Sequence, residues 1–319
     1  MKIIYIAWAP YNRRAETFAD QIGAEVELIH FFKYQRPFWA LFKYPLMAIK
    51  TFVKLFSKKP TVVFAMSPPL FCAFFVYLYC LFFQARFVID AHTGSLITPP
   101  WTWFRFLHKF LSRRATVTIV TNNYLASLVE SWGAKAMIIN PPIFFPDVKT
   151  FPLEGKINFL VVNTFSGDEP LDEVLKAANN FPEVHFYITG DLSKARHDQI
   201  EMCPPNAHFT DFLPYKKYLE LLKSVDGVIA LTTRDHTLQS GGMEALFMGK
   251  PLITSHFPFL MNFFSKGTVY VEPKAESIIN GVYRFITGHE ILQKEIVKLR
   301  AERWREWKGD LTRLMKIIS

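Results

Sequence analysis

Short apolar runs alternate with amphipathic segments along most of the chain. In the first half, strand-like runs such as KIIYIAWA (2–9), TVVFAMS (61–67) and RFVIDAH (86–92) are separated by helix-like segments such as NYLASLVESWG (123–133). The same alternation restarts with INFLVVNT (157–164) and continues towards the C-terminus. Alternating strands and helices predict parallel sheets with helices on both faces.

A proline-rich stretch separates the two series of elements. The segment NPPIFFPDVKTFPLEGK (140–156) has a composition typical of a linker. A length of 319 residues is enough for about two domains. We therefore predict an α/β protein with two doubly wound, Rossmann-like domains that face a cleft, residues 1–145 and 146–319. Ligands of such sheets bind beyond the carboxyl ends of the strands.

Charge changes this picture because it is concentrated in the first half. Residues 1–150 contain 17 Lys and Arg but only 7 Asp and Glu. Between Glu27 and Glu130 the only acidic residue is Asp90. A basic region predicts an acidic partner, either nucleic acid or an anionic membrane. Because the basic residues lie among large apolar ones and no nucleic-acid-binding motif is present, we expect a membrane surface and no nucleic acid.

Two segments of the basic half have the composition of membrane-interface helices. Residues 38–59 place a row of lysines on one side of a helix and large apolar residues on the remaining surface, and residues 101–114 interleave aromatic and basic side chains. Core-facing helices with solvated basic faces would give the same pattern. We predict a cytoplasmic protein, peripheral on the inner membrane face. The predicted membrane-facing residues are Lys43, Lys50, Lys54, Trp101, Trp103 and Arg105.

The most apolar part of the chain is too short to span a bilayer. The uncharged run 61–84 is interrupted by Pro68 and Pro69, which leaves 14 residues, 70–83. A spanning helix needs ~20 apolar residues, so we predict a strand, a turn and a buried helix. No metal-ligand spacing surrounds the cysteines, and we expect neither a disulfide framework nor a zinc site. The three cysteines are Cys72, Cys80 and Cys203.

Candidate chemistry is concentrated in DHTLQSGGMEALFMGKP (235–251). A helix N-terminus has free N–H groups that suit an anion. Gly241 and Gly242 would let a phosphate approach the backbone, and Ser240 would cap the helix or donate to a phosphate oxygen. Glu244, which we place in the first turn, would accept hydrogen bonds from ribose hydroxyls. A glutamate that only stabilises the helix dipole, after a tight turn, would give the same pattern.

A longer stretch around this motif, GVIALTTRDHTLQSGGMEALFMGKPLIT (227–254), resembles the family 4 type of GT-B glycosyltransferases found in bacteria. Four further segments resemble the family in the same order along the chain. They are VIDAHTG (88–94), NTFSGDEPLDEVLKAA (163–178), FYITGD (186–191) and TDFLPYKKYLELLKSVDGVIAL (210–231). The resemblance implies a GT-B fold and a nucleotide-sugar donor held mainly by the second domain. It also implies a C-terminal helix that crosses back onto the first domain, although a solvated helix at 289–316 fits equally well.

The resemblance also implies roles for individual residues. Glu244 matches the family's ribose-binding glutamate, whereas His236 stands where the family has another glutamate. The loop TFSGDEP (164–170) lacks the family's Arg and Lys, so nearby arginines become candidates for the diphosphate. For catalysis we predict His92, Asp90 and His236. For donor binding we predict Arg13, Arg14, Phe165, Ser166, Gly190, Thr233, Arg234, Ser240, Gly241, Gly242 and Glu244.

Alternative interpretations exist for the predicted site residues of the first domain. His92 would also fit as a hydrogen-bonded core histidine, and Arg13 and Arg14 as a solvated helix start. If His92 lies next to the donor sugar, as in the family, Asp90 would orient its imidazole or act as a base towards the acceptor.

The predicted function is therefore that of a hexosyltransferase. It would move a sugar from a UDP- or GDP-sugar to a lipid-linked or polysaccharide acceptor at the cytoplasmic membrane face. We expect no cofactor and no metal, since no Asp-x-Asp motif is present, and the resemblance implies retention of the anomeric configuration. One alternative is a nucleotide-sugar epimerase or hydrolase on the same fold. Another is a non-catalytic GT-B-like membrane or partner subunit, which the departures at His236 and 164–170 would suit.

Overall fold

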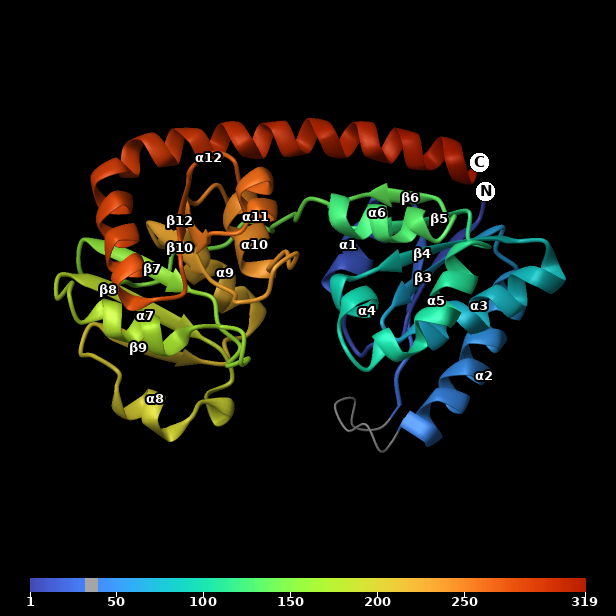
Figure 1. Cartoon of the computed structure of the whole chain (residues 1–319), viewed down its shortest axis with the longest axis horizontal. Helices are drawn as coiled ribbons and strands as arrows, with labels where there is room; N and C mark the ends of the chain where they lie inside the picture. The colour runs from blue at the N-terminus through green and yellow to red at the C-terminus, as the bar shows by residue number, and fades with distance from the viewer. Residues whose placement is uncertain (32–39) are drawn as a thin grey trace. The chain divides into compact units, whose positions relative to one another are not determined.

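The computed structural model describes residues 1–31 and 40–319 (Figure 1). The chain divides into two compact units, residues 1–141 with 306–319 and residues 142–305. Each unit contains a six-stranded parallel sheet, so the predicted class of two doubly wound, Rossmann-like domains is confirmed. The division follows Pro141, a few residues before the predicted boundary, and it assigns the end of the chain to unit 1.

Unit 1 is built on a sheet in which β1 lies between β2 and β3. Its order is β2-β1-β3-β4-β5-β6. Strands β1 and β3 are buried over their whole length, as expected for a parallel sheet covered on both faces. The chain changes direction across the sheet between β1 and β3, which makes this the topological switch point. The strands are β1 (Ile3–Ala7), β2 (Glu25–Leu28), β3 (Val62–Ser67), β4 (Arg86–Ala91), β5 (Val117–Val120) and β6 (Ala136–Ile138).

Helices cover both faces of this sheet. One face carries α2 (Ala40–Lys58), α3 (Leu70–Phe83), α5 (Arg105–Ser112) and α6 (Asn123–Ser131), which share one apolar core. The other carries α1 (Arg13–Gln21) and the end of α12 (Ala275–Ile318). Here Phe18 packs against Tyr5 and Phe64 of the sheet and against Trp307 of α12. The apolar run 70–83 is a helix within this layer, as predicted, but its last three residues, Leu81, Phe82 and Phe83, are exposed and not buried.

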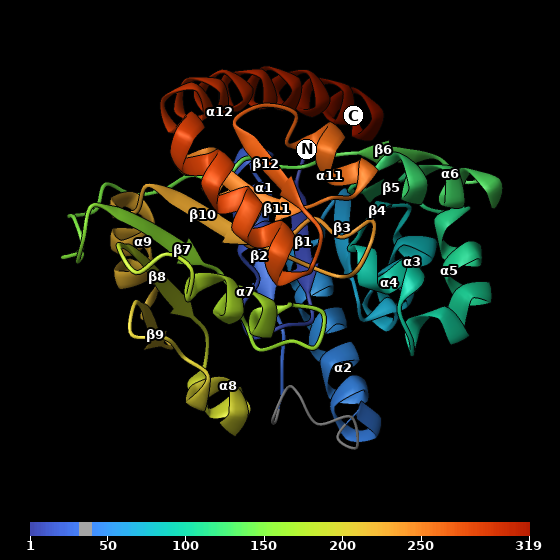
Figure 2. The ribbon, with the colours of Figure 1, turned by 60° about the vertical axis from the view of Figure 1, so that its left-hand side comes forward.

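Unit 2 has the strand order of a dinucleotide-binding sheet, β12-β11-β10-β7-β8-β9, with its switch point between β7 and β10. Apolar residues of α7 (Leu171–Ala178) and the first part of α12 pack on one face. Those of α9 (Tyr215–Ser224) and α10 (Ser240–Met248) pack on the other. Figure 2 shows the sheet and α7 of this unit from a second direction. The strands are β7 (Ile157–Val161), β8 (Val184–Thr189), β9 (Ala207–Asp211), β10 (Gly227–Ala230), β11 (Leu252–Ser255) and β12 (Thr268–Val271).

The sequence pattern missed mainly short elements. Strand β9 and the helices α4 (Thr93–Ile97), α8 (His197–Glu201) and α11 (Pro258–Phe263) were not predicted, because four to six residues carry little periodicity. The segment predicted as one helix at 101–113 is a 3-10 turn (Trp101–Phe104) followed by α5. The predicted helix at 38–59 is α2, and residues 38 and 39 lie outside the described residues.

The charged tail is part of a longer helix than predicted. Helix α12 begins at Ala275 instead of 289, and its residues from Glu306 onwards group with unit 1. Trp307 is buried there, and Arg86 donates to the carbonyl of Ile318 at 2.8 Å. Among the described residues, no helix combines the length and apolar character that crossing a bilayer requires.

Candidate functional site

The carboxyl edge of the unit 2 sheet carries most of the predicted donor-binding residues. Two loops leave the sheet at its switch point, one after β7 and one after β10. A small hollow lies where they diverge, lined among others by Asn163, Glu169 and Leu231. Doubly wound sheets bind their ligands at this position. The loops are therefore the place to test for a nucleotide site.

The loop after β7 is held in shape by its own side chains. Glu169 accepts hydrogen bonds from the backbone N–H of Thr164 at 2.7 Å and of Ser166 at 3.1 Å. Phe165 adopts a left-handed backbone (φ 58°), and its ring closes over Gly190. A Cβ atom at Gly190 would lie 2.8 Å from that ring. The structure thus brings the ring of Phe165 against Gly190, and Ser166 lies next to Phe165 on the same loop.

An acidic residue absent from the sequence prediction joins the two loops. Asp168 accepts a hydrogen bond from the Thr232 hydroxyl at 2.8 Å, and its carboxylate lies 3.2 Å from the Arg234 guanidinium. Burial raises the pKa of Asp168, but hydrogen bonds from Ser166 and Thr232 and the charge of Arg234 outweigh it and hold the pKa below its usual value. Thr233, also predicted, donates through its N–H to the carbonyl of Asp168. The side chain of Arg234 keeps 58% of its surface exposed, so it remains accessible to an anion.

The start of α10 differs from the prediction in two ways. The N-cap is Gln239, and Ser240 is the first helical residue, exposed and not a cap. Gly241 and Gly242 are glycines for packing: a Cβ at Gly241 would lie 2.7 Å from Val162, and one at Gly242 2.8 Å from Phe264. Their missing side chains let α10 approach its neighbours in unit 2, and the directions of the absent Cβ atoms are occupied.

Glu244 is the fifth residue of α10 and therefore lies beyond the first turn, contrary to the prediction. It is buried, with 6% of its surface exposed. The Tyr218 hydroxyl of α9 donates a short hydrogen bond to its carboxylate. A buried carboxylate supplied with a donor is a defined acceptor group. Glu244 therefore has a defined position on α10, fixed by its contact with Tyr218.

His236 lies on the loop between β10 and α10 in a left-handed backbone conformation (φ 58°). Its Nε2 is 3.6 Å from the carboxylate of Asp235, which also accepts the backbone N–H of His236 at 2.6 Å. Left-handed non-glycine residues are uncommon and mark positions that the surroundings constrain. The loop thus holds an imidazole and a carboxylate together at the position where the family has a glutamate.

At the carboxyl edge of the unit 1 sheet, the predicted catalytic residue Asp90 is already bound by other side chains of the protein. Asp90 is completely buried, and Arg14 donates to both its oxygens, at 2.9 and 3.0 Å. The Tyr5 hydroxyl donates to the same carboxylate at 2.5 Å, and Arg14 also donates to the carbonyl of Ile139. This corrects two predictions. Asp90 is buried and does not face an acceptor as a base. The guanidinium of Arg14 binds a carboxylate and a carbonyl and is therefore not available to a diphosphate.

The pKa values in this cluster follow from the pairing. Burial raises the pKa of Asp90, but the charge and hydrogen bonds of Arg14 outweigh it and hold the pKa below its usual value. Burial and the adjacent Asp90 raise the pKa of Tyr5 well above its ordinary range. At neutral pH the cluster is therefore an ion pair with a neutral tyrosine.

His92 is the predicted catalytic residue whose geometry still allows contact with a ligand. Its Nε2 is buried and has no hydrogen-bond partner within the described chain, which is uncommon for a buried polar atom. Burial lowers the pKa of His92, and the charge of Arg14 adds to this against the opposite effect of Asp90. The imidazole is therefore neutral near pH 7. Arg13, the neighbour of Arg14, is half-buried and donates to the Tyr11 hydroxyl at 3.2 Å.

Sequence reasoning missed several participants. Tyr5, Asp168 and Tyr218 contact predicted residues. Gln239 is the N-cap of α10 and has a buried side-chain oxygen without a partner in the described chain. Gln239 directly precedes Ser240 and was the most accessible to prediction, whereas Tyr5 and Asp90 are 85 residues apart. None of the edge residues named above belongs to a group of three metal-ligand atoms within the described chain.

The exposed face of α2 is the opposite of the predicted one. Lys43 is buried, with 6% of its surface exposed, and Lys54 pairs with Glu27 at 2.9 Å. The ammonium of Lys50 lies 5.4 Å from the centre of the Phe31 ring. Lys54 and Lys58 therefore pair with the glutamates of β2, and the lysine side does not form an exposed basic stripe. The exposed side is apolar and consists of Phe42, Leu46, Ile49, Val53 and Phe56.

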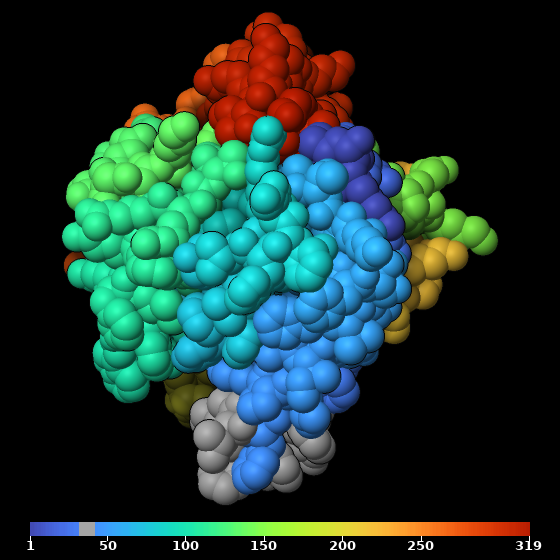
Figure 3. Space-filling model, turned by 90° about the vertical axis from the view of Figure 1, so that its right-hand side faces the viewer, coloured from blue at the N-terminus to red at the C-terminus, as the bar shows by residue number. Residues whose placement is uncertain are grey.

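This apolar stripe continues on the neighbouring helices. Phe56 packs edge-on against Phe83, at the exposed end of α3. Near α5, Trp103 is exposed, Arg105 is exposed beside it, and Trp101 is half-buried. Figure 3 shows this face of unit 1. The surface is therefore mainly apolar, with basic residues among the aromatic ones around α5.

Comparison with known proteins bears on the fold. No protein-family model and no curated protein sequence matches the chain. Among solved structures, sucrose-phosphate synthase from Thermosynechococcus elongatus matches with a TM-score of 0.75 and 11% identity, over 99% of this chain and 98% of that one. HepE from Anabaena, in complex with UDP-glucose, matches with a TM-score of 0.73 and 13% identity, over 99% of both chains.

A third match is a protein proposed to be a UDP-N-acetylglucosamine 2-epimerase, from Listeria monocytogenes. Its TM-score is 0.64 at 11% identity, over 92% of this chain and 91% of that one. These likenesses extend over nearly the whole chain and confirm the GT-B fold of two Rossmann-like domains. At such low identity they show the fold alone, and membership of family 4 stays a prediction.

Proposed function

We propose that the protein is a glycosyltransferase that moves a sugar from a UDP- or GDP-sugar to a lipid-linked or polysaccharide acceptor, as in polysaccharide biosynthesis. The observation that carries the proposal is the buried carboxylate of Glu244, held by Tyr218, on the helix that follows the switch-point loop. Ribose hydroxyls are donors that such a carboxylate would accept. The match to a structure that contains UDP-glucose supports a nucleotide-sugar as the donor.

The proposed reaction breaks the bond between the anomeric carbon of the sugar and a diphosphate oxygen. A bond from that carbon to an acceptor hydroxyl oxygen forms, and the hydroxyl loses its proton. Negative charge grows on the diphosphate, where fixed donors lower the barrier most. Arg234 and the free N–H groups at the start of α10 are the candidates in unit 2. We propose that transfer needs no metal ion and retains the anomeric configuration.

In unit 1, the proposal assigns the sugar contact to His92. A neutral imidazole with an unpartnered, buried nitrogen is suited to a hydrogen bond with a sugar hydroxyl. Asp90 and Arg14 would act indirectly, because their ion pair lies directly before His92 and supports the strand end that carries it. Their proposed role is structural.

Donor binding tests the proposal directly. Thermal-shift measurements with UDP, GDP and their sugars should show stabilisation by one nucleotide class, ~2.7 kcal/mol at 100-fold its Kd. Glu244→Gln should weaken donor binding at least ~10-fold, or ~1.4 kcal/mol. Glu220→Gln is the matched control, since Glu220 is a buried glutamate of α9 paired with Lys217. Equal donor affinity in wild type and Glu244→Gln would contradict the assignment.

Two other functions remain candidates on specific observations. The likeness to a proposed epimerase favours epimerisation or hydrolysis on the same fold, and release of free nucleotide without any acceptor would support it. His236 and the loop 164–170 differ from the family pattern described above. These differences favour a non-catalytic subunit, which would bind the donor without turnover. Product analysis with radiolabelled donor, with and without a membrane extract as acceptor source, separates all three.

We further propose that unit 1 binds the inner face of the cytoplasmic membrane through the apolar stripe of α2 and the aromatic residues around α5. From residue 40 to residue 114 the only acidic residue is Asp90, which is buried. No exposed carboxylate therefore opposes an anionic lipid surface along this part of the chain. Large apolar residues at the interface and basic residues beside them are the two contributions that membrane association uses.

Vesicle sedimentation tests this face. The protein should sediment with anionic phospholipid vesicles, and Ile49→Glu with Val53→Glu should abolish it, since both side chains are exposed and the fold does not depend on them. Lys50→Glu with Lys54→Glu is the comparison and should have the smaller effect, because Lys54 is already paired with Glu27. Sedimentation unchanged by the Ile49 and Val53 substitutions would contradict the proposal.

A further inference from the structure

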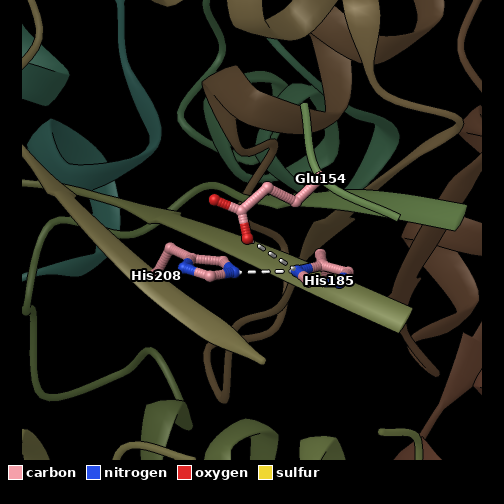
Figure 4. A group of neighbouring side chains, drawn as sticks. All are labelled: Glu154, His185 and His208. Carbon is pink, nitrogen blue, oxygen red and sulfur yellow. Dashed lines mark hydrogen bonds and ion pairs between the residues drawn. The ribbon is translucent and has the colours of Figure 1, made fainter. Parts of the chain in front are cut away.

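Two histidines and a glutamate from distant parts of the chain converge on unit 2 (Figure 4). His185 lies on β8, His208 on the neighbouring β9 and Glu154 in the segment that precedes β7. The Nδ1 of His185 and the Nε2 of His208 are 2.9 Å apart. A carboxylate oxygen of Glu154 lies 4.0 Å from the same Nδ1, and the three ligand atoms all lie within 4.8 Å of one another.

The backbone around this cluster holds Glu154 in place. The N–H of Glu154 donates to the Tyr187 hydroxyl at 2.8 Å, and the Tyr187 ring lies beside His208 with centroids 5.1 Å apart. The next residue, Gly155, has a left-handed backbone (φ 72°), and a Cβ there would come within 2.5 Å of the His185 ring. Glycine is therefore required at 155 for the segment to pass this close to the imidazole.

We propose that Glu154, His185 and His208 bind a divalent transition-metal ion of the zinc type. Two imidazoles and one carboxylate are a ligand set that zinc accepts, with a fourth position left for water. Calcium and magnesium prefer all-oxygen sites and are disfavoured here. Tetrahedral bonds of ~2.0–2.1 Å place two nitrogens about 3.3 Å apart, so the imidazoles need to separate by only a few tenths of an ångström and to turn their lone pairs towards the ion.

Metal binding would leave the number of protons on the two imidazole rings unchanged. Without a metal, one imidazole donates its ring N–H to the other. With a metal, each neutral ring keeps one proton, on the nitrogen that does not bind, so only a tautomer changes.

The site is separate from the proposed chemistry. His185 is the second residue of β8 and lies at the amino end of that strand, whereas the loops of the candidate donor site leave the carboxyl ends. Glu154 belongs to the segment that leads from Pro142 into β7. A bound ion would therefore fasten this connecting segment to β8 and β9. The expected role is stabilisation of unit 2, and it does not depend on the proposed function.

Titration of the metal-free full-length protein with Zn²⁺ tests the proposal. Calorimetry should show one site per chain, and Co²⁺ should give the intense visible absorption of a tetrahedral complex. His208→Gln and Glu154→Gln should each weaken Zn²⁺ binding at least ~10-fold, the loss expected of even an outer-shell partner. His197→Gln is the matched control, because His197 is an exposed histidine of α8 that lies beside a single helix neighbour, Glu201, at 3.1 Å and not in the cluster. It should leave this binding unchanged.

The outcomes separate the proposal from its alternative. Binding of one Zn²⁺ that is lost in both variants but kept in the control supports the site. Absence of stoichiometric binding to the wild-type protein overturns it and leaves a hydrogen-bonded histidine pair. Equal binding in wild type and His208→Gln overturns it as well. Because the wild-type titration decides by itself, a variant that fails to fold does not remove the test, and circular dichroism identifies such a variant.

Discussion

The two sheets have similar edges but use their charged residues differently. At the carboxyl edge of unit 1, Asp90 is completely buried and binds Arg14, whose side chain is 18% exposed. At the corresponding edge of unit 2, Asp168 and Arg234 also pair, but the Arg234 side chain remains 58% exposed. At the same edge of a doubly wound sheet, unit 1 thus has a buried ion pair and unit 2 has a solvent-accessible cation. A charged residue at such an edge is therefore not by itself evidence of a ligand site.

Burial explains the difference in physical terms. A carboxylate without solvent needs a partner that meets both its oxygens, and a guanidinium does so with two parallel hydrogen bonds. Breaking such a pair leaves an uncompensated charge in the protein interior. An exposed pair exchanges its partner for water or for a ligand at little cost. Each of the following substitutions tests one side of this comparison.

The largest effect is expected from Arg14→Leu. It leaves the carboxylate of Asp90 buried without its cation, and we expect a loss of about 3–5 kcal/mol in the free energy of unfolding. Urea denaturation followed by circular dichroism measures it. Arg13→Leu is the neighbouring control, and it should cost about 1 kcal/mol or less, because Arg13 is only half-buried and donates to the exposed Tyr11. Similar losses in both variants would show that the ion pair is not what distinguishes the two arginines.

The next effect concerns packing at the edge of unit 2. Gly241→Ala should destabilise the protein by about 1–2 kcal/mol, because the contact with Val162 outweighs the gain in helix propensity. Gly167→Ala is the control, since no atom of the described residues lies within 4 Å of the Cβ position there. Thermal unfolding compares the two. A stabilised Gly241→Ala variant would restore the earlier interpretation that this glycine is present for a phosphate.

An effect of similar or smaller size is expected at Arg234. Arg234→Gln should weaken binding of the nucleotide-sugar about 10-fold, or ~1.4 kcal/mol, while leaving stability nearly unchanged because the side chain is exposed. Calorimetric titration with the preferred donor measures it. Arg196→Gln serves as control, because Arg196 is another exposed arginine of unit 2, paired with Asp172. A donor affinity that responds equally to both would place the diphosphate elsewhere.

The smallest effect is the acid dependence of stability. The folded pKa of Asp90 lies below its unfolded value, so its pairing stabilises the protein above the unfolded pKa, about 3.9. This contribution is lost as the pH falls towards the folded pKa, at no more than about 1.4 kcal/mol per pH unit. Asp90→Asn should therefore differ most from wild type near neutral pH and converge with it in acid. Parallel pH profiles from pH 7 to pH 3 would contradict this.

Long, regular elements of the chain could be predicted from the sequence. Buried strands such as β1 and β3 are continuous apolar runs, α3 begins directly after Pro69, and α10 ends before Gly249. The loops after β7 and β10 follow from the strand order that this pattern implies. Helix α8 and strand β9 could not be recognised, because such short segments carry too little periodicity to separate them from loops.

The candidate site was predicted in part. The position of Glu244 on a helix after a switch-point loop follows from the local motif, but its partner Tyr218 lies on another helix. The packing contact that requires glycine at 241 could not be predicted either, because its partner Val162 lies far away in the chain. In α2, the lysine row and the apolar row were both visible in the sequence. Glu27 of β2 determined which of them faces outwards.

The sequence by itself determined the two series of strands and helices, the uneven charge and the sheet edges at which the loops gather. These properties depend on periodicity and composition, which are local. Only the tertiary structure decided that Asp90 binds Arg14, 76 residues away, and that His185 meets His208 and Glu154. Such pairings depend on which strands become neighbours, and burial then determines whether a charged group is held by the protein or left for a ligand.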